Sequence, residues 1–515
     1  MKNLPVIDIA VIVIYLLAML VVGVWFSRKN KSSEQFTTAS GLIPGWAVGI
    51  SLYATFLSSN TFLGVPGKAF GSNWNALVFS LSMPLAAWAA VKYFVPFYRT
   101  IGGVSAYTHL EHRFGSWART YAVVCFLLTQ LARMGSIFFG IALSLQALTG
   151  FDMTTIMVVT GICIVIYTVM GGMEAVIWTE VVQGVLLTFG GLLVLYLVVT
   201  HIDGGVSSMV NIGLADGKFS LGSFDMDFVG SSFWVILLYG FFINLNNFGM
   251  DQNYVQRYHT ATSAKEAAKS VWLCVKIYIP ISLLFFVIGS ALYAYYEQNP
   301  ALTETIRLQA AAERLPAGAA QAEINSLAAA LQAEDYGDKV MPHFMVNKVP
   351  VGLLGLVISA ILAAAMSTIS SGMNASATVF TEDVYKRYIR PNSTNKQSLR
   401  MLFVATGVFG ILGMVAGVGM IGVQSILDVW WELSGIFAGG MLGLFLLGLI
   451  SKKAGNSEAI IAVIAGVLAI LWMTFSYLIP EQYGYLRYPL HANMIIVVGT
   501  LVISLVGSGL ARVRR

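Results

Sequence analysis

The sequence predicts an all-α membrane protein that crosses the bilayer about thirteen times. Hydrophobic residues fill 57% of the 515 positions and charged residues 11%, whereas a soluble domain carries roughly 25% charged residues. Apolar runs of about 20 residues, enough for a helix to span a bilayer, recur from end to end. We expect one transmembrane domain, 1–515, with spans near 7–27, 43–66, 74–98, 120–148, 153–171, 175–200, 232–256, 270–294, 350–373, 400–420, 425–450, 457–478 and 491–511.

The distribution of charged residues predicts the orientation of these spans. With the N-terminus outside, thirteen crossings put every second loop in the cytoplasm, where Lys and Arg concentrate. Basic residues do gather in those segments, including Arg28, Lys31, Arg257, Lys386 and Arg512. The two long outer loops carry mainly Asp and Glu. The net charge of +5 therefore reflects membrane topology and predicts no nucleic-acid partner.

Several function classes lack their usual signatures. The three cysteines, Cys125, Cys163 and Cys274, all fall inside apolar spans, so no disulfide framework or CxxC metal site is expected. The sequence contains no P-loop, no GxGxxG after a strand and no HExxH. We therefore expect neither an ATP-driven transporter nor an enzyme.

The first core span, 43–66, begins as an apolar helix and then violates the pattern of one. Ser58, Ser59, Asn60 and Thr61 come together, and Gly64, Pro66 and Gly67 follow. Non-helical backbone at membrane depth is tolerated only where it is buried in protein or lines a wet cavity. This pattern predicts a discontinuous helix of the kind that marks binding sites in secondary transporters. The alternative is a continuous, kinked helix whose hydroxyls bond back to their own backbone.

The number of spans predicts an inverted repeat. If the first helix, 7–27, is peripheral, then 43–200 and 232–450 each supply five helices, and 457–511 adds two at the C-terminus. Because five is odd, the second set is inverted relative to the first, and the sixth core helix, 232–256, should be broken like the first. That helix carries the dense polar run FFINLNNFGMDQN. Two corresponding interruptions predict a binding site at the bilayer midplane.

The eighth core helix carries a cluster of hydroxyls, Ser367, Thr368, Ser370 and Ser371, spaced so that three or four share one face. A hard monovalent cation needs oxygen ligands, which an unwound helix and a facing hydroxyl cluster can supply. Carbonyls of Ala54, Leu57 and Ala364 with the hydroxyls of Ser367 and Thr368 would provide five. The alternative is a face of small residues that lets helices pack closely.

Charged residues inside the spans are the other functional signal, because each is costly to insert. Arg133 lies in the middle of the third core helix and can present a rigid fork to a carboxylate. Glu180 lies on the fifth, Lys276 on the seventh and Glu432 on the tenth. The alternative for Arg133 is an ion pair with Glu180 or Glu432 as a structural lock.

The run GGMEAVIWTEVVQ, from Gly171 to Gln183, together with the Ser-rich eighth helix, resembles the sodium/solute symporter family, of LeuT-like fold with five plus five inverted helices. The resemblance extends from about Ile7 to the end and is greatest to bacterial sodium/sialic acid and sodium/galactose transporters. It implies a symporter that couples Na⁺ entry to uptake of a small hydrophilic solute by alternating access.

The resemblance also implies ion sites. The family's conserved sodium would be held by Ala54, Leu57, Ala364, Ser367 and Thr368. A second sodium, found in the sialic acid transporters, would use Ser367, Ser370, Ser371 and an acid on helix five. That acid is usually Asp and here is Glu180, one methylene longer, so one or two sodium ions are expected.

For the solute, the resemblance matches Arg133 to a carboxylate-binding Arg and implies a carboxylated sugar such as sialic acid. The sequence departs from the sialic acid transporters at Ser80, Ala76 and Phe56, where they carry Gln, an aromatic residue and Thr. A neutral sugar or another organic solute, coupled to sodium or to protons through Glu180, is the alternative. The expected solute contacts are Ser58, Ser59, Thr61, Ser80, Arg133, Asn244, Asn247 and Phe248.

The expected setting is a bacterial inner membrane, with the N-terminus outside and the C-terminus in the cytoplasm. The expected partners are the solute, sodium and the lipid bilayer, and the transport unit is expected to be monomeric. The outer loop near 296–349 is Ala- and Glu-rich and is divided by Pro316 and Gly318. It predicts two short amphipathic helices that form either a solvated cap or a lid.

Overall fold

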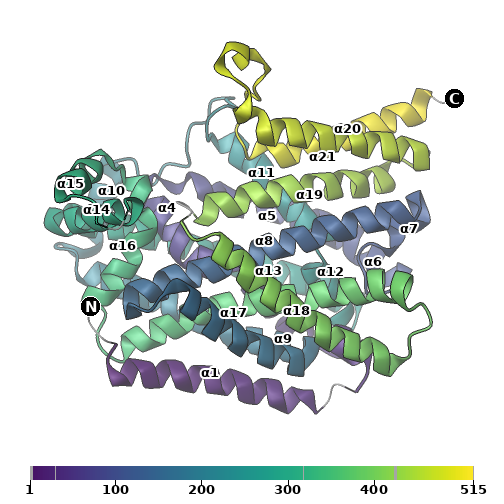
Figure 1. Cartoon of the computed structure of the whole chain (residues 1–515), viewed down its shortest axis with the longest axis horizontal. Coiled ribbons are helices and arrows are strands. Elements are labelled where there is room, and N and C mark those ends of the chain that lie inside the picture. The colour runs from purple at the N-terminus through teal and green to yellow at the C-terminus, as the bar shows by residue number, and fades with distance from the viewer. Residues whose placement is uncertain (1–3, 29–30, 317, 423–425, 514–515) are drawn as a thin grey trace.

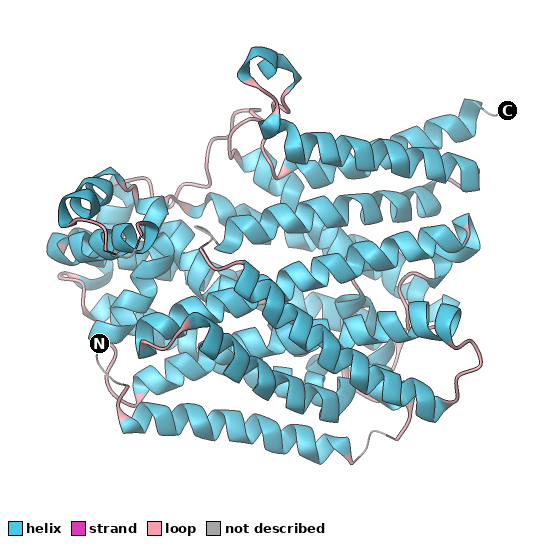
Figure 2. Cartoon of the chain, viewed as in Figure 1, coloured by secondary structure: helices cyan, strands magenta, loops and turns pink. Residues whose placement is uncertain are grey.

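Helices supply the regular structure of the computed structural model, which describes residues 4–28, 31–316, 318–422 and 426–513. Within these ranges no strand forms, and one isolated bridge joins Ile43 to Ala261. Figure 2 shows this all-helical architecture. The long helices run side by side, from α1 (Val6–Ser27) at one edge to α20 (Asn456–Phe475) and α21 (Met494–Val513) at the other (Figure 1).

Eleven helices among the described residues are long and apolar enough to cross a membrane. One of them, α9 (Met153–Thr200), has 48 residues and would measure about 72 Å if straight. It changes direction at Gly172, whose φ of 59° and ψ of −163° are not helical. The bent pair 45–56 and 60–71 adds a further span. Counted in this way the helices accommodate thirteen crossings, and the number of crossings stays a prediction.

The first core span is broken, as the sequence predicts. Its first half is α3 (Gly45–Phe56), and its second half is the π-helical turn η2 (Asn60–Gly64) followed by α4 (Val65–Gly71). The two halves meet at an angle of 58°. Leu57 is extended, with φ −91° and ψ 128°, so the carbonyls before it are released from helical hydrogen bonding.

The sixth core span is broken too. The helix α11 (Phe233–Met250) ends before Asp251, which is extended with φ −75° and ψ 119°, and α12 (Gln252–Thr260) follows. The Asp251 carboxylate accepts a hydrogen bond from the Asn253 amide at 2.8 Å and thereby caps α12. Arg257, which the charge pattern assigned to a cytoplasmic loop, instead lies on α12 with its side chain fully buried. The periodicity of the span did not reveal that α12 turns inward.

The other long helices fill the space around these two. They are α5 (Leu77–Ala89), which continues through η4 (Ala90–Phe94) into α6 (Val95–Ile101), and α8 (Ser116–Thr149), α13 (Ala264–Glu297), α17 (Leu353–Val379), α18 (Asn395–Gly419) and α19 (Ile426–Ile450). The most buried of the candidate spans is Leu353–Ile389, which contains α17 and the π-helical turn η5 (Phe380–Ile389). It packs against α9, α8, α18, α1 and α3. The hydroxyl cluster is therefore held at the centre of the bundle.

The first helix is more than a peripheral anchor. Asp8 of α1 is fully buried, and its Oδ1 accepts hydrogen bonds from the backbone amides of Gly352 and Gly355 at 2.7 and 2.6 Å. These are orphan donors at the start of α17. The carboxylate thus caps, from another helix, the element that carries the hydroxyl cluster.

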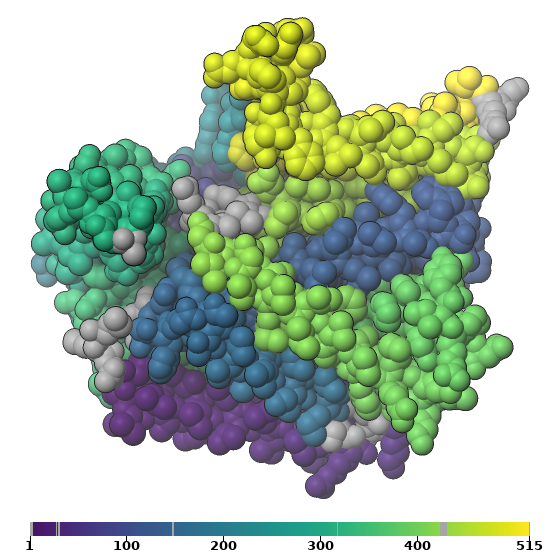
Figure 3. Space-filling model, in the orientation of Figure 1, coloured from purple at the N-terminus to yellow at the C-terminus, as the bar shows by residue number. Residues whose placement is uncertain are grey.

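Short helices gather at one end of the bundle, where the N-terminus also lies (Figure 1). They are α10 (Gly205–Ala215), α14 (Pro300–Arg314), α15 (Gln321–Ala330) and α16 (Ala333–Lys348). The loop near 296–349 therefore forms three helices rather than the predicted two, because extended residues Leu331 and Gln332 add a second break. In the space-filling view these helices project from the bundle (Figure 3). At the opposite end lie α6, α7 (Thr108–Phe114) and the C-terminus.

Candidate ion and solute site

Five buried oxygens come together where α3 ends against α17. The Ser367 hydroxyl lies 3.1 Å from the Ala54 carbonyl and 2.9 Å from that of Ala364. The Thr368 hydroxyl lies 3.1 Å from the Leu57 carbonyl and 3.3 Å from the Ala364 carbonyl. All five predicted ligand groups for the first sodium are therefore neighbours.

The chemistry of this cluster suits a hard cation of low charge. Its oxygens are backbone carbonyls and hydroxyls, with no carboxylate, sulfur or imidazole among them. Among the described residues no group of three or more His, Cys, Asp or Glu side chains is placed to hold a metal ion. The close packing of small residues on α17, weighed above as an alternative, coexists with the cluster and brings the oxygens together.

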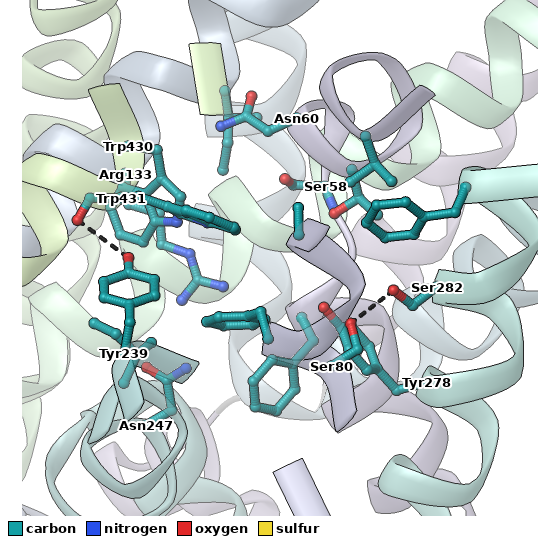
Figure 4. Close-up of a pocket in the computed structure, with 18 of the residues that line it drawn as sticks. Ser58, Asn60, Ser80, Arg133, Tyr239, Asn247, Tyr278, Ser282, Trp430 and Trp431 are labelled. Carbon is teal, nitrogen blue, oxygen red and sulfur yellow. Dashed lines mark hydrogen bonds between the residues drawn. The ribbon is translucent and has the colours of Figure 1, made fainter. Parts of the chain in front are cut away.

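A cavity opens beside this cluster, between the two broken helices and α5, α8, α13 and α19 (Figure 4). Arg133, on α8, points its guanidinium into the cavity (Figure 4). Its Nη2 donates to the Thr55 carbonyl at 2.7 Å and to the Tyr254 hydroxyl at 3.2 Å. Its Nη1 lies 3.9 Å from Asp251 Oδ2, a loose ion pair that leaves the fork facing the cavity. Arg133 is thus held by fixed partners with its guanidinium at the cavity wall.

Five of the eight predicted solute contacts line this cavity: Ser58, Thr61, Ser80, Arg133 and Asn247. The Ser80 hydroxyl lies 2.7 Å from that of Ser282 on α13, so Ser80 forms a hydroxyl pair in the cavity wall (Figure 4).

The structure corrects the expected place of the other three. Ser59 donates to the Ile137 carbonyl at 3.2 Å. The Asn244 amide lies 3.2 Å from the Ser82 hydroxyl. Phe248 is buried between aromatic rings, 5.5 Å from that of Phe56. None of Ser59, Asn244 or Phe248 lines the cavity, because each faces a neighbouring helix; spans and polar runs alone do not tell which side of a broken helix faces inward.

Much of the lining is aromatic, and the sequence reasoning missed it. Phe79 stacks on Trp431 with ring centroids 5.6 Å apart, and the Tyr239 hydroxyl donates to the Trp431 carbonyl at 3.1 Å (Figure 4). The run VWWELSG could have drawn attention to Trp430 and Trp431, but tryptophan is also common in lipid-facing positions. These rings supply an apolar platform against which a sugar ring or an alkyl chain can pack.

Asn60 is a second residue that the predicted set omitted. Its Nδ2 donates to the Ser136 hydroxyl at 3.0 Å. Its Oδ1 is buried and has no hydrogen-bond partner within the described part of the chain. Buried acceptors of this kind are uncommon, and this one belongs to a side chain on the cavity wall. A solute hydroxyl or amide could donate to it.

The residues predicted for a second sodium are only partly assembled. Ser371 donates to Glu180, whereas the Ser370 hydroxyl lies 3.1 Å from the Ser367 carbonyl. Both Glu180 carboxylate oxygens accept from Arg257 Nη2 at 2.8 Å. The lock considered for Arg133 does not form with either acid, because Glu180 pairs with Arg257 and Glu432 is exposed.

Comparison with known proteins adds to this geometry. A sequence model of the sodium:solute symporter family matches residues 36–466. The chain is 34% identical to the sodium/sialic acid symporter SiaT of Proteus mirabilis, over 90% of this chain and 89% of that protein. It is 32% identical to the sodium/sialic acid symporter NanT of Aliivibrio fischeri, over 96% of this chain and 90% of that protein.

Solved structures agree with the fold. The substrate-bound, outward-open state of a Na⁺-coupled sialic acid symporter matches with a TM-score of 0.85 at 31% identity, covering 99% of this chain and 98% of that one. The nucleobase-cation symporter Mhp1 shares the fold alone, with a TM-score of 0.55 at 14% identity over 94% of this chain and 95% of that one. The expected LeuT-like class of fold is confirmed.

Proposed function

Because the chain belongs to the sodium:solute symporter family, we propose that it imports a carboxylated sugar of the sialic acid class together with sodium, by alternating access. It is a multi-pass membrane protein. We further propose that it resides in a bacterial inner membrane, with the N-terminus outside and the C-terminus in the cytoplasm. It acts as a transporter rather than an enzyme, and its transport unit is a monomer.

The observation that carries the solute class is the orientation of Arg133. A buried guanidinium needs an anion nearby, yet among the described residues the acid that pairs with it, Asp251, lies at 3.9 Å and already accepts from Gln130 and Asn253. Nη2 is occupied by Thr55 and Tyr254, whereas a solute carboxylate can bind Nη1 with little competition. The sialic acid symporters at 34% and 32% identity support this reading.

The five-oxygen cluster supports sodium as the coupling ion. Sodium would bind Ala54, Leu57, Ala364, Ser367 and Thr368 and so hold α3 to α17. A proton-coupled mechanism through Glu180 fits less well, because Arg257 and two serine hydroxyls already occupy that carboxylate.

The ion and the solute would share one stretch of backbone. The Thr55 carbonyl, which accepts from Arg133, lies between the carbonyls of Ala54 and Leu57 in sequence. Sodium that fixes this unwound segment would also fix the direction of the Arg133 fork. Each ligand would then favour the binding of the other, which is what coupled transport requires.

The organisation of the chain fits the same proposal. We propose that 43–200 and 232–450 are inverted repeats of five helices, with 7–27 outside them and 457–511 added at the end. The two broken helices, in corresponding positions, would place the site at the repeat interface. Helices α14–α16 would then face the outside and α7 the cytoplasm.

Thermal unfolding of the purified protein tests the proposal. N-acetylneuraminate at 100 times its dissociation constant should stabilise the protein by about 2.7 kcal/mol, and only when sodium is present. The neutral analogue N-acetylmannosamine should give no shift, and Arg133→Ala should lose the N-acetylneuraminate shift while remaining folded. A rise in melting temperature with N-acetylmannosamine alone would show that the solute is a neutral sugar. Equal rises in sodium and in potassium would refute sodium coupling.

A further inference from the structure

A second ion pair lies inside the bundle, apart from the Arg133 cavity. It joins Arg257 on α12 to Glu180 on α9, with 1% and 0% of the two side chains exposed. Glu180 is also one of the residues that the family resemblance assigns to a second sodium site. Whether a sodium ion fits there can be judged from the oxygens that remain available.

Both oxygens of the Glu180 carboxylate already accept hydrogen bonds from neighbouring side chains. Its Oε1 accepts from Arg257 Nη2 at 2.8 Å, from the Ser371 hydroxyl, and at 3.4 Å from the Thr55 hydroxyl. Its Oε2 accepts from Arg257 Nη2 at 2.8 Å and from the Ser51 hydroxyl. Each carboxylate oxygen offers about two lone-pair directions, so both are saturated.

The guanidinium also holds the neighbouring hydroxyls. Arg257 Nη2 lies 2.6 Å from Ser371 Oγ, and its Nε donates to Ser51 Oγ at 2.8 Å. Its Nη1 donates to the Asn253 carbonyl. The guanidinium therefore binds two groups, Glu180 and Ser371, that a second sodium would need as ligands.

Charge balance leads to the same conclusion. The pair is neutral as it stands, because Arg257 already compensates the negative charge that Glu180 would otherwise offer to a sodium ion. The extra methylene of glutamate, compared with the usual aspartate, carries the carboxylate further from α9 toward α12. This departure from the family pattern favours the ion pair over a bound ion.

We infer that Arg257 occupies the place of the second sodium as a tethered cation, so that this chain carries one sodium ion per solute. The inference rests on the proposed sodium symport. It has a consequence for energetics: one Na⁺ with one monovalent carboxylate carries no net charge across the membrane. Two sodium ions would carry one net positive charge, and accumulation would then respond to membrane potential by about 50-fold per 100 mV.

Reconstituted proteoliposomes test the stoichiometry with the whole chain. At zero membrane potential, a tenfold sodium gradient should accumulate N-acetylneuraminate about tenfold if one ion is coupled and about a hundredfold if two are, because each ion contributes the same free energy. We expect the tenfold value and no stimulation by an inside-negative potential. Hundredfold accumulation, or strong stimulation by potential, would overturn the inference.

Substitutions of Arg257 and Glu180 show whether Arg257 excludes a second sodium ion or only stabilises the fold. Removing the tethered cation in Arg257→Gln should let sodium enter, raising accumulation toward a hundredfold. The double variant Glu180→Gln with Arg257→Gln is neutral and should return to about tenfold, which also controls for folding. Arg99→Gln is a matched control, since Arg99 donates to the Tyr258 and Ala261 carbonyls at the end of the same region. A hundredfold value in the double variant would contradict the assignment.

A solute-independent measurement distinguishes failure of this inference from failure of the proposed function. Sodium should raise the melting temperature of the protein without solute, and Thr368→Val should abolish the whole of that sodium-specific shift if one site exists. A residual shift in Thr368→Val that vanishes when Glu180→Gln is added would establish a second sodium and refute the inference. If N-acetylneuraminate is not accumulated at all, the proposed solute falls, while the sodium titration still decides the number of ions.

Discussion

At the scale of single residues, Arg133 owes its function to geometry as much as to charge. Its fork is fixed by the Thr55 carbonyl at 2.7 Å and the Tyr254 hydroxyl at 3.2 Å. Arg133→Lys keeps the positive charge but loses the planar fork, and we expect solute affinity to fall by roughly tenfold to a hundredfold, as for the loss of a charged hydrogen bond of about 1.5–3 kcal/mol.

The same logic supplies a control at Tyr254. Tyr254→Phe removes one hydroxyl that orients the fork and leaves the ring against Phe56, 4.5 Å away. We expect a smaller loss, about threefold to tenfold, because the Arg133 side chain stays in place and the Thr55 carbonyl still orients it. Isothermal titration with N-acetylneuraminate in sodium measures both affinities. Unchanged binding in Arg133→Lys would show that Arg133 serves only the fold.

The sodium cluster makes a second prediction at this scale. Ser367→Ala deletes the hydroxyl that lies 3.1 Å from the Ala54 carbonyl. We expect the sodium concentration for half-maximal stabilisation to rise by roughly fivefold to thirtyfold, because one of five ligands is lost at a cost of about 1–2 kcal/mol. Ser359→Ala is matched, since Ser359 is buried on the same helix and donates to the Gly355 carbonyl at 2.8 Å. The proposal would be weakened if both variants titrated alike.

At the scale of the element, α1 is coupled to the helix that carries the hydroxyl cluster. Asp8 is the cap, and its Oδ2 is buried without a partner within the described residues. Asp8→Ala should lower the free energy of unfolding by about 1–3 kcal/mol, since it leaves two amides of α17 without their charged acceptor.

The measurement is thermal unfolding in detergent, with Asp152→Ala for comparison. Asp152 immediately precedes α9 and caps it by accepting a hydrogen bond from the Thr155 amide. This position is exposed, so water can take the place of the lost carboxylate. We therefore expect a smaller loss there. Equal melting temperatures for the Asp8 variant and the native protein would mean that α1 contributes nothing to the stability of α17.

The sequence predicted some structural elements and their contacts but not others. Both broken helices follow from polar runs inside apolar spans, because unpaired backbone has few places to exist in a membrane. Arg133 and the oxygen cluster follow for the same reason, since intramembrane charges and hydroxyls are costly unless they are used. The pairing of Glu180 with Arg257 did not follow, because it depends on α12 folding inward, and that is set by packing between distant segments. The aromatic lining escaped detection because apolar residues look the same whether they face lipid, core or cavity.

At the scale of the whole molecule, the proposed alternating access requires contacts that can open. At the end that carries α6 and α7, Gln256 of α12 donates to the Asn374 and Thr378 side chains of α17 at 3.0 and 3.2 Å. Ser105, before α7, donates to Asp383 of η5, which continues α17, and Arg119 of α8 pairs with the same carboxylate. These bonds join α12 and the loop before α7 to α17, so opening this end must break them.

Gln256→Met tests that requirement, because it keeps the volume of the side chain and removes its hydrogen bonds. We expect the conformational equilibrium to shift toward the state open at this end by about threefold to tenfold for each bond lost, at 0.5–1.5 kcal/mol each. We propose that sodium binds the state that is closed at this end, so it should then bind more weakly, in proportion to the smaller competent fraction. The reporter is a cysteine at Thr381, a buried position about one turn beyond Thr378 on the same face of the span, in a background whose three native cysteines are alanine. Gln256→Met should speed maleimide labelling of this cysteine, and sodium should slow it again. Labelling that ignores both the substitution and sodium would mean that α12 and α17 do not separate during transport, and the opening would have to be sought elsewhere in the bundle.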